Sequence, residues 1–336
     1  MNRIARMSAR ERAGIFAETA DRKGLANAIV EKDFWVCWIL KQLFSIPDLE
    51  GRLLFKGGTS LSKVFHAIER FSEDLDLAVD YAALGFTGDR DPRQEGISKS
   101  RRTVILEQMM ESCRGYISGP FLDVLRARIQ EVLGEASWSL TVSPQDPNIV
   151  NFVYPAAQSG RLDYIAPHVV LELGTHAEFV PHDQFTITSF VAEEFPKVVE
   201  DPQISLSALL AKRTFWEKAT ILHAEYYRPP EKALPARYSR HYYDVAQLAR
   251  GPVRAEALAD PTLLAAVVRH KQTFYPSAWA RYELAQRGGL RLTPTAARRV
   301  ELERDYSRMG VMLFGTPTGF DTIMEALADL EREINA

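Results

Sequence analysis

One short unit constrains the fold of this chain more than any other part of its sequence. Residues 52–56 (Arg-Leu-Leu-Phe-Lys) predict a strand, and the glycine pair 57–58 ends it. Acids alternate with aliphatic residues over 74–79, which predicts a second strand. Between the strands, apolar residues spaced i, i+3, i+4, i+7 predict a helix capped by Thr59 or Ser60. Its expected inner face consists of Leu61, Val64, Phe65 and Ile68.

Two acids of the second strand are the first candidates for chemistry. Because side chains two apart on a strand share one face, the carboxylates of Asp74 and Asp76 are expected to lie close together. Two like charges so close repel, and a divalent cation removes that conflict. Magnesium suits such a pair because it typically takes one or two carboxylates together with substrate phosphates. For an isolated Asp-x-Asp the alternative is a solvated edge strand with its acids facing water.

The glycine pair before the helix favours the functional interpretation. Glycines between a strand and a helix let the backbone approach a ligand closely, and the helix start offers free N–H groups to phosphate. A P-loop is disfavoured, because Lys63 follows Ser62 inside the helix and no Gly-Lys-Ser/Thr is present. The sequence thus combines a glycine turn that can bind phosphate, one helix and a strand with paired acids. This combination favours a site for a triphosphate and a metal ion.

A third acid is expected from a neighbouring strand. Glu172 lies in the apolar run 169–174, where a lone charge is costly unless it is paired or binds metal. A salt bridge to a nearby Lys or Arg is the structural alternative for it. Asp163, in a less regular context, is the rival for the same role.

The rest of the chain predicts an α+β protein with a helical C-terminal part. Two amphipathic helices are expected near 103–117 and 120–134, and the pattern from Ser205 onward is helical to the end. The expected division is N-terminal helices at 1–50, a catalytic core at 51–200 and a helical domain at 201–336. Four further strands are expected around 137–143, 149–154, 167–173 and 184–190.

Composition sets limits on location and partners. The 336 residues are 46% hydrophobic and carry a net charge of −3, so composition does not predict a protein that coats nucleic acid wholesale. The two cysteines share no metal-ligand spacing, which favours a reducing cytoplasm. The N-terminus lacks the apolar run of a secretory signal, and no apolar stretch is long enough to cross a bilayer, so no membrane partner is expected.

The chain resembles the nucleotidyltransferase AbiEii/AbiGii toxin family, whose members belong to the polymerase-β-like nucleotidyltransferase superfamily. The similarity rests on the motif at 55–61 (Phe-Lys-Gly-Gly-Thr-Ser-Leu) followed by the motif at 70–77 (Arg-Phe-Ser-Glu-Asp-Leu-Asp-Leu). It extends over roughly residues 25–250, and the last 80 or so residues resemble nothing that we can name. The remaining matching segments are Glu31-Lys32-Asp33-Phe34-Trp35-Val36, Leu171-Glu172-Leu173, Arg213-Thr214-Phe215-Trp216-Glu217-Lys218 and Arg240-His241-Tyr242-Tyr243-Asp244-Val245.

The resemblance implies a polymerase-β-like core and specific roles for individual residues. Asp74 and Asp76 would bind metal and form the catalytic centre, with Glu172 as the least regular third ligand. Lys218 would contact phosphates of the nucleotide, and Asp244 matches a later aspartate of the family. Nucleotide binding is expected at Lys56, Gly57, Gly58, Thr59 and Ser60.

The resemblance also implies a function. Such a protein would use Mg²⁺ to move a nucleoside monophosphate from an NTP to an acceptor hydroxyl, and some family members add nucleotides to the 3′ end of tRNA. It would act as the toxin of a toxin–antitoxin or abortive-infection system, restrained by an antitoxin protein. A small-molecule or protein acceptor, a non-catalytic nucleotide- or partner-binding module and a metal-dependent hydrolase remain alternatives. The base preference among ATP and the other NTPs, the oligomeric state and the role of residues 255–336 stay open. The candidates for an RNA surface are Lys99, Arg101, Arg102, Arg126, Arg128, Lys212 and Arg213.

Overall fold

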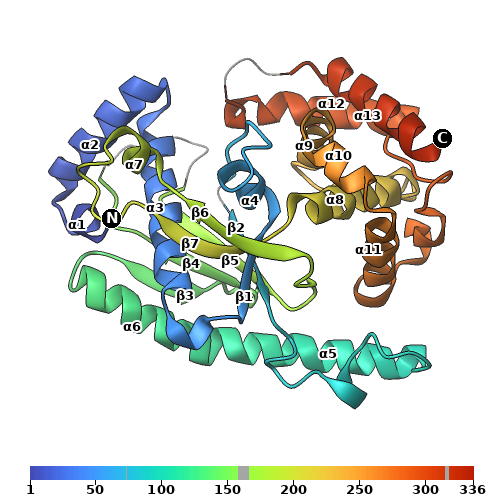
Figure 1. Ribbon diagram of the computed structural model, residues 1–336, viewed down its shortest axis with the longest axis horizontal. Helices are drawn as coiled ribbons and strands as arrows, with labels where there is room; N and C mark the ends of the chain where they lie inside the picture. Colours follow the sequence, from blue (N-terminus) through green and yellow to red (C-terminus); the bar gives the residue numbers. More distant parts are fainter. Residues whose placement is uncertain (73, 158–165, 315–317) are drawn as a thin grey trace. The chain divides into compact units, whose positions relative to one another are not determined.

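The computed structural model describes residues 1–72, 74–157, 166–314 and 318–336. Contacts divide the chain into two compact units (Figure 1). The first unit comprises residues 1–64 and 73–208, and the second comprises 65–72 and 209–336. The division expected from the sequence, with limits at residues 50 and 200, stays a prediction about domain organisation.

The first unit is built on one mixed seven-stranded sheet in the order β3-β4-β5-β2-β1-β7-β6. In the centre β1 and β2 are antiparallel, while β2 with β5 and β1 with β7 are parallel. The predicted α+β class is confirmed. The strands are β1 (Leu53–Lys56), β2 (Asp74–Val79), β3 (Ser139–Val142), β4 (Ile149–Val153), β5 (His168–Gly174), β6 (His182–Ile187) and β7 (Ile204–Leu209).

Helices of the first unit cover the apolar face of this sheet. Leu75, Leu77 and Leu171 are fully buried or nearly so, in one core with residues of α3 and α6. These two helices also pack on each other (Figure 1). The helices of this unit are α1 (Asn2–Ala5), α2 (Ala9–Lys23), α3 (Asn27–Phe44), η1 (Pro47–Leu49), α4 (Gly57–Lys63), η2 (Gly88–Arg90), α5 (Lys99–Tyr116), the π turn η3 (Ile117–Phe121), α6 (Leu122–Leu133) and α7 (Phe190–Glu194).

The second unit is helical, apart from a single bridge between Arg70 and Leu313 in the described chain. That bridge belongs to residues 65–72, which join the C-terminal helices through backbone bonds from Phe71 N to Met312 O (2.7 Å) and from Phe314 N to Glu69 O (2.9 Å). The helices are α8 (Ala211–Tyr226), α9 (Ser239–Arg250), α10 (Val253–Leu258), α11 (Pro261–Phe274), η4 (Ala278–Ala280), η5 (Tyr282–Leu284), α12 (Ala296–Met309), η6 (Gly310–Met312) and α13 (Phe320–Asn335).

The helix expected after the glycine pair is shorter than predicted. Helix α4 begins at Gly57, after Lys56 in extended conformation, and its C-cap is Val64. His66 then adopts a positive φ of 48°, which a helix does not accommodate. Phe65 and Ile68 therefore do not continue the inner face of α4 but belong to the second unit.

The expectation of a purely helical pattern from Ser205 onward is wrong for its first residues. Strand β7 occupies Ile204–Leu209 and pairs parallel to β1, with Phe55 opposite Ala208. Burial alternates along it, because Ile204 and Leu206 are buried whereas Ser205 is exposed. This period of two is the signature of a strand with one covered face.

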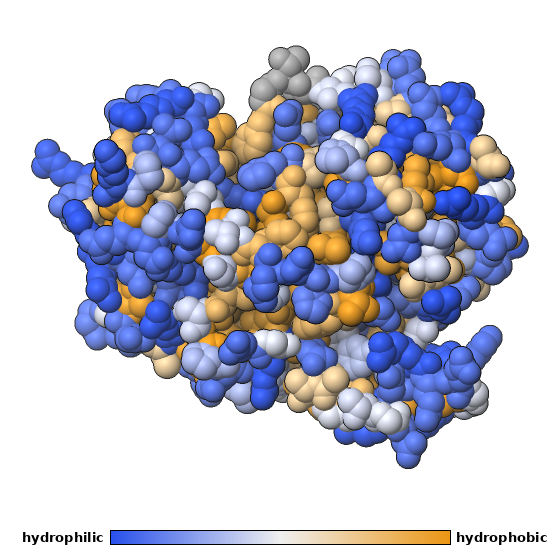
Figure 2. All heavy atoms as spheres, viewed as in Figure 1, coloured by the Kyte–Doolittle hydropathy of each residue, from blue (hydrophilic) through white to orange (hydrophobic). Residues whose placement is uncertain are grey.

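The two helices predicted near 103–117 and 120–134 are confirmed, but they are joined. Helix α5 passes through the π turn Ile117–Phe121 into α6 without a loop (Figure 1). Pro120 lies inside this turn, where the wider spacing accommodates a residue without an N–H group. In the described parts of the chain no helix has the length and apolar composition needed to cross a membrane, and the face shown in Figure 2 carries many hydrophilic side chains.

Candidate active site

The paired acids lie on the central strand β2, as the alternating sequence predicts. Leu75 and Leu77 between and after them are fully buried, while Asp74 and Asp76 are half-buried on the opposite face. The sequence therefore places both carboxylates on one side of the strand, away from the apolar core.

The glycine turn touches one of these acids directly. Lys56, the last residue of β1, pairs with Asp76 across the antiparallel ladder. Gly57 follows with φ of +79°, and a Cβ added there would lie 1.8 Å from Oδ2 of Asp76 and 2.4 Å from its Cγ. A side chain at this position would force the Asp76 side chain or the first turn of α4 to shift, because the backbone of residue 57 lies against the carboxylate itself.

The two residues with hydroxyl groups that follow the glycines are buried inside the first unit. Thr59 and Ser60 are each only 1% exposed. The Thr59 hydroxyl donates a hydrogen bond of 2.5 Å to the backbone oxygen of Asp74, which joins the first turn of α4 to the start of β2. Gly58 is also buried in this turn. The predicted nucleotide-binding residues 56–60 thus lie beside the paired acids, and their contacts with a nucleotide stay a prediction.

The third acid shares the face but does not complete a ligand set. Glu172 on β5 pairs with Asp76 across the parallel ladder, and its side chain is exposed. Within the described ranges, no three His, Cys, Asp or Glu side chains converge closely enough to hold a metal ion. Asp163, the rival, lies outside the described residues.

The residues present still fit magnesium bound with a nucleotide. Mg²⁺ retains water and is usually held by one or two carboxylates plus substrate phosphates rather than by a protein cage. Asp74 and Asp76 supply two carboxylates on one face, and the backbone at Gly57 comes within contact of Asp76. Two acids beside a glycine turn therefore suit a metal that arrives with a triphosphate.

A second cluster of predicted residues forms inside the second unit. Asp244 on α9 is completely buried and accepts two hydrogen bonds from the Arg70 guanidinium, at 2.7 and 2.9 Å. Lys218 on α8 places its Nζ 2.8 Å from Oδ2 of the same carboxylate. Arg70 and Asp244 thus form a buried bidentate pair.

The charges in this cluster fix the protonation of its members. Burial alone would raise the pKa of Asp244, but the charges and hydrogen bonds of Arg70 and Lys218 outweigh it and hold that pKa well below its ordinary value. Burial, with the cations Lys218 and Arg240 nearby, keeps the pKa of His241 well below its ordinary value. Asp244 is thus ionised and His241 is neutral at physiological pH.

The structure accordingly brings the predicted residues together in two groups. Residues 56–60, Asp74, Asp76 and Glu172 gather on the sheet of the first unit. Lys218 and Asp244 gather in the second unit, with Arg70 as the member whose pairing was not foreseen from the sequence. The functional roles of all of them stay predictions.

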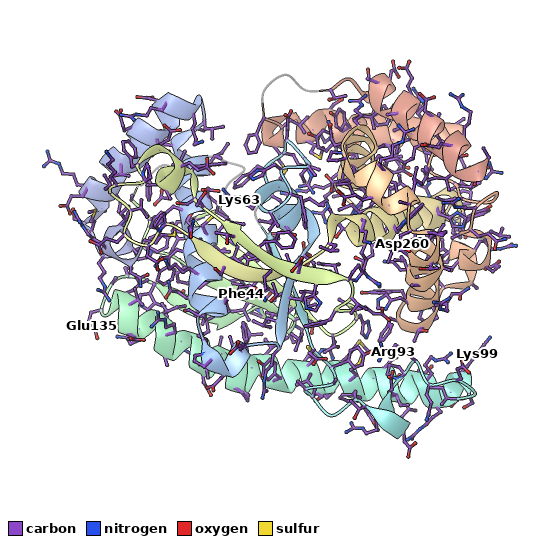
Figure 3. All side chains as sticks on the ribbon, in the orientation of Figure 1. Phe44, Lys63, Arg93, Lys99, Glu135 and Asp260 are labelled. Carbon is purple, nitrogen blue, oxygen red and sulfur yellow. The ribbon has the colours of Figure 1, made fainter. Side chains whose placement is uncertain are left out.

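Several basic residues expected on an RNA surface are used differently. Arg213 is 1% exposed and pairs with Glu217, and Lys212 pairs with Asp260, which Figure 3 labels. Arg213 is therefore not part of an exposed basic surface on α8. Lys99 and Arg101, at the start of α5, are exposed, and Lys99 is labelled in Figure 3.

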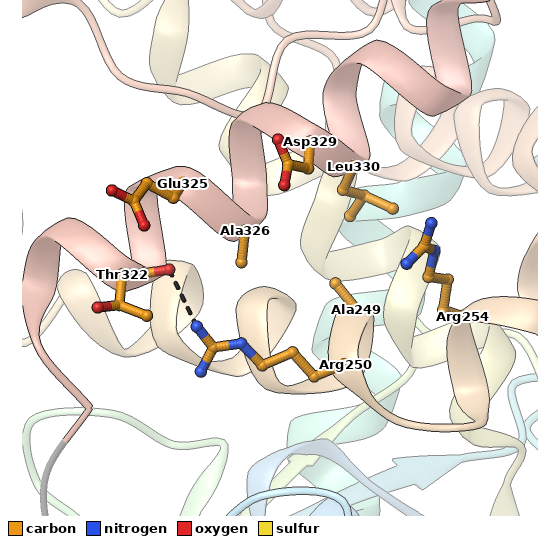
Figure 4. Close-up of a pocket in the computed structure, with 8 residues that line it drawn as sticks. All are labelled: Ala249, Arg250, Arg254, Thr322, Glu325, Ala326, Asp329 and Leu330. Carbon is orange, nitrogen blue, oxygen red and sulfur yellow. Dashed lines mark hydrogen bonds between the residues drawn. The ribbon is translucent and has the colours of Figure 1, made fainter.

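A pocket of about 360 Å³ in the second unit lies apart from these clusters, between α9, α10 and α13 (Figure 4). Arg250 and Arg254 line it opposite Glu325 and Asp329. Arg250 donates to the backbone oxygen of Thr322 at 3.0 Å. The mixture of opposite charges gives this pocket no clear ligand, and none of the predicted site residues lines it.

Comparison with known families gives a match over most of the chain. Residues 38–326 match the family described as the nucleotidyl transferase AbiEii toxin of type IV toxin–antitoxin systems. Among curated proteins, none matches the chain.

Two solved structures are similar over nearly the whole chain. The nucleotidyltransferase toxin MenT4 from Mycobacterium tuberculosis H37Rv aligns over 96% of this chain and 96% of its own, with 16% identity and a TM-score of 0.41. JHP933 from Helicobacter pylori aligns over 92% of this chain and 91% of its own, with 12% identity and a TM-score of 0.41.

Proposed function

Since the chain belongs to the nucleotidyl transferase AbiEii toxin family of type IV toxin–antitoxin systems, and is thus a nucleotidyltransferase, we propose that it moves a nucleoside monophosphate from an NTP to a hydroxyl at the 3′ end of tRNA. The family implies a nucleotide substrate and an antitoxin partner. The proposal further includes that the reaction depends on magnesium, that the acceptor is tRNA and that the protein acts in the cytoplasm.

One observation carries the proposal. The backbone of Gly57 packs directly on the carboxylate of Asp76, with Asp74 two residues earlier on the same face. A triphosphate at the start of α4 would lie within reach of both acids. Phosphoryl transfer depends mainly on positioning and electrostatic stabilisation, so a small set of such groups is sufficient.

The residues of the chain have distinct roles in this mechanism. Asp74 and Asp76 would hold Mg²⁺, which when bound polarises the α-phosphate and shields the charge of the departing pyrophosphate. The backbone at residues 57–58 holds the phosphates. Asp76 or Glu172 accepts the proton of the acceptor hydroxyl as its oxygen forms a bond to the α-phosphorus. In the second unit Asp244 fixes the direction of the Lys218 ammonium group, and contact of Lys218 with phosphate is the role that the family resemblance implies.

The charge of the two units supports a nucleic-acid acceptor. The first unit has 21 Lys and Arg against 28 Asp and Glu, a net charge of −7, and the second has 20 against 16, a net charge of +4. The overall charge of −3 hides this asymmetry. A polyanion is attracted to a surface of positive charge, so the second unit is the better candidate to hold RNA.

A transfer assay tests the proposal. The protein is incubated with Mg²⁺, each α-labelled NTP in turn and tRNA, and the products are separated on a denaturing gel. We expect label in the tRNA band, and no label when the tRNA 3′ end has been oxidised with periodate or when EDTA is present. Label on the protein itself or on a small molecule would move the proposal to another acceptor, and phosphate release without transfer would replace it by hydrolysis. Co-expression of the neighbouring gene should relieve growth arrest if that gene encodes the antitoxin.

A further inference from the structure

Three consecutive charged residues of α3 are buried in the first unit. Glu31, Lys32 and Asp33 are 6%, 1% and 3% exposed. Helix α3 begins at Asn27, so these residues lie inside the helix, one turn from its start. Burying a charge is costly unless it is paired and hydrogen-bonded. The partners of these three side chains therefore show which elements this turn of α3 contacts.

Asp33 holds the end of helix α4. Its Oδ1 pairs with the ammonium of Lys63, the last residue of α4, and the two side chains are 3% and 10% exposed. Its Oδ2 accepts a hydrogen bond of 2.7 Å from the backbone N–H of Phe190. Lys63, labelled in Figure 3, also lies 3.5 Å from the carbonyl oxygen of Thr188 and 3.8 Å above the Phe190 ring. The ammonium group is thus enclosed by a carboxylate, a carbonyl and an aromatic face.

The residue before Asp33 holds the start of strand β5. The ammonium of Lys32 donates to the carbonyl oxygen of Ala166 at 3.0 Å and to that of His168. His168 begins the strand that carries Glu172. One turn of α3 therefore contacts both elements that flank the acids of β2.

Helix α4 depends on this pairing more than a long helix would. It has only seven residues, so contacts at its two ends contribute much to its position, beside the packing of its buried residue Leu61. At its start Gly57 packs on Asp76 and Thr59 bonds to the backbone of Asp74. At its other end Lys63 forms a buried ion pair with Asp33. A shift at that end would be transmitted through less than two turns to the glycine.

We propose that Asp33 and Lys63 are positioning residues for nucleotidyl transfer, which hold α4 so that the backbone at Gly57 stays seated on the Asp76 carboxylate. This inference rests on the proposed function for its effect on catalysis, but its structural part does not. Neither residue touches the reacting atoms in this proposal; both act through α4.

Variants of the pair test the proposal. Asp33→Asn keeps the shape and the acceptor for Phe190 but removes the charge that faces Lys63, and Lys63→Met keeps the stem and removes the ammonium group. The double variant Asp33→Asn with Lys63→Met removes the pair as a whole. Glu225→Gln is the matched control, because it breaks another buried pair, with Arg228 in the second unit, that contacts none of the proposed machinery.

Two measurements are made on each variant. The first is hydrogen exchange of the peptide covering residues 57–63 in nucleotide-free protein, and the second is the kcat and KM of NMP transfer to tRNA. We expect faster exchange of this peptide and a kcat lower by about tenfold to a hundredfold, with a smaller change in KM, because misplaced groups lose rate more than binding. Glu225→Gln should lower thermal stability without either effect. The double variant should be no slower than the slower single variant, because one interaction is lost in both.

The outcomes separate this inference from the proposed function. If the wild type transfers no nucleotide, the proposed function fails, and the exchange measurement alone still decides whether the pair holds α4. The positioning role is overturned if the peptide covering residues 57–63 exchanges its amide hydrogens at the wild-type rate in both Asp33→Asn and Lys63→Met. It is also overturned if both variants transfer NMP to tRNA at the wild-type rate. If Glu225→Gln lowers kcat as much as they do, the loss follows general stability and the role is likewise overturned.

Discussion

Asp76 in the first unit and Asp244 in the second are both aspartates of recognisable motifs, but their surroundings differ. Asp76 is half-buried on a sheet face, beside a glycine whose backbone touches its carboxylate. Asp244 is completely buried, and both of its oxygens are engaged by Arg70 and Lys218. The first carboxylate retains access to a ligand, whereas the second is fully used in holding two cations.

The difference separates two kinds of contribution to one activity. A carboxylate that binds a metal has to keep an oxygen free for it, which the setting of Asp76 allows. A carboxylate that compensates two buried cations contributes through their placement, and removing it leaves both without their partner. Loss of Asp76 should therefore change activity more than stability, and loss of Asp244 should change both.

Replacement of Asp76 gives the largest expected effect on activity. Asp76→Ala should lower NMP transfer by about a thousandfold or more, because several kcal/mol of metal-dependent charge stabilisation are lost. The midpoint of urea unfolding should change little. Asp183→Asn, an exposed acid on β6, is the control and should leave both unchanged. Transfer at the wild-type rate by Asp76→Ala would remove this acid from the site.

Replacement of Asp244 should cost stability. Asp244→Ala leaves the cations of Arg70 and Lys218 buried without their carboxylate, so the free energy of unfolding should fall by about 3–5 kcal/mol. Urea unfolding followed by circular dichroism measures this. The comparison between the two aspartates would break down if Asp244→Ala proved as stable as the wild type.

A side chain at residue 57 tests the contact between glycine and acid. Gly57→Ala should lower transfer by about a hundredfold, because the added Cβ displaces Asp76 or the first turn of α4. Gly134→Ala is the control: that residue also has a positive φ, of +58°, but an added Cβ there meets nothing within 4 Å. Both variants should lose about 1–3 kcal/mol through backbone strain at a positive φ, and only Gly57→Ala should lose activity. Equal activities would mean that the close approach has no functional consequence.

Acid should weaken the contribution of Asp244 to stability. The folded pKa of Asp244 is depressed, so its stabilising contribution is complete above the unfolded pKa of about 3.9 and is lost as the pH falls further. From about pH 4 downward the wild type should lose up to about 1.4 kcal/mol more per pH unit than Asp244→Asn does. Urea unfolding at pH 7, 5, 4 and 3 measures this difference. Parallel curves for the two proteins would show that the cluster does not stabilise the ionised form.

The sheet acids could be predicted from sequence because their signal is local. Strand β2 occupies 74–79, as the alternation of acids and aliphatics predicts, and its face follows from the period of two. Strand β7 carries a similar alternation over Ile204–Leu209. This signal covers only six residues directly before a long helical region, so the helical pattern dominates the sequence there. The capping of α2 by Ser8 is equally local, because it forms a capping box with Glu11 three residues later.

The long-range pairings could not be predicted in this way. Arg70 and Asp244 are 174 residues apart, and no periodicity within either segment specifies which cation meets which acid. The same holds for Asp33 and Lys63, although one signal was present: charged residues inside the apolar helix α3 require buried partners. The sequence shows that a partner is needed, and only the fold identifies it.

The segment 65–72 has a consequence for experiments that divide this protein. It leaves the first unit after α4, joins the C-terminal helices and returns before β2, so the chain passes between the units three times rather than once. A fragment that stops at residue 208 would keep this segment but lose the C-terminal helices that it joins. The Arg70 guanidinium would then lack the Asp244 carboxylate. Expression of the first unit alone therefore calls for a designed bridge from residue 64 to residue 73, and residues 209–336 expressed alone would lack Arg70.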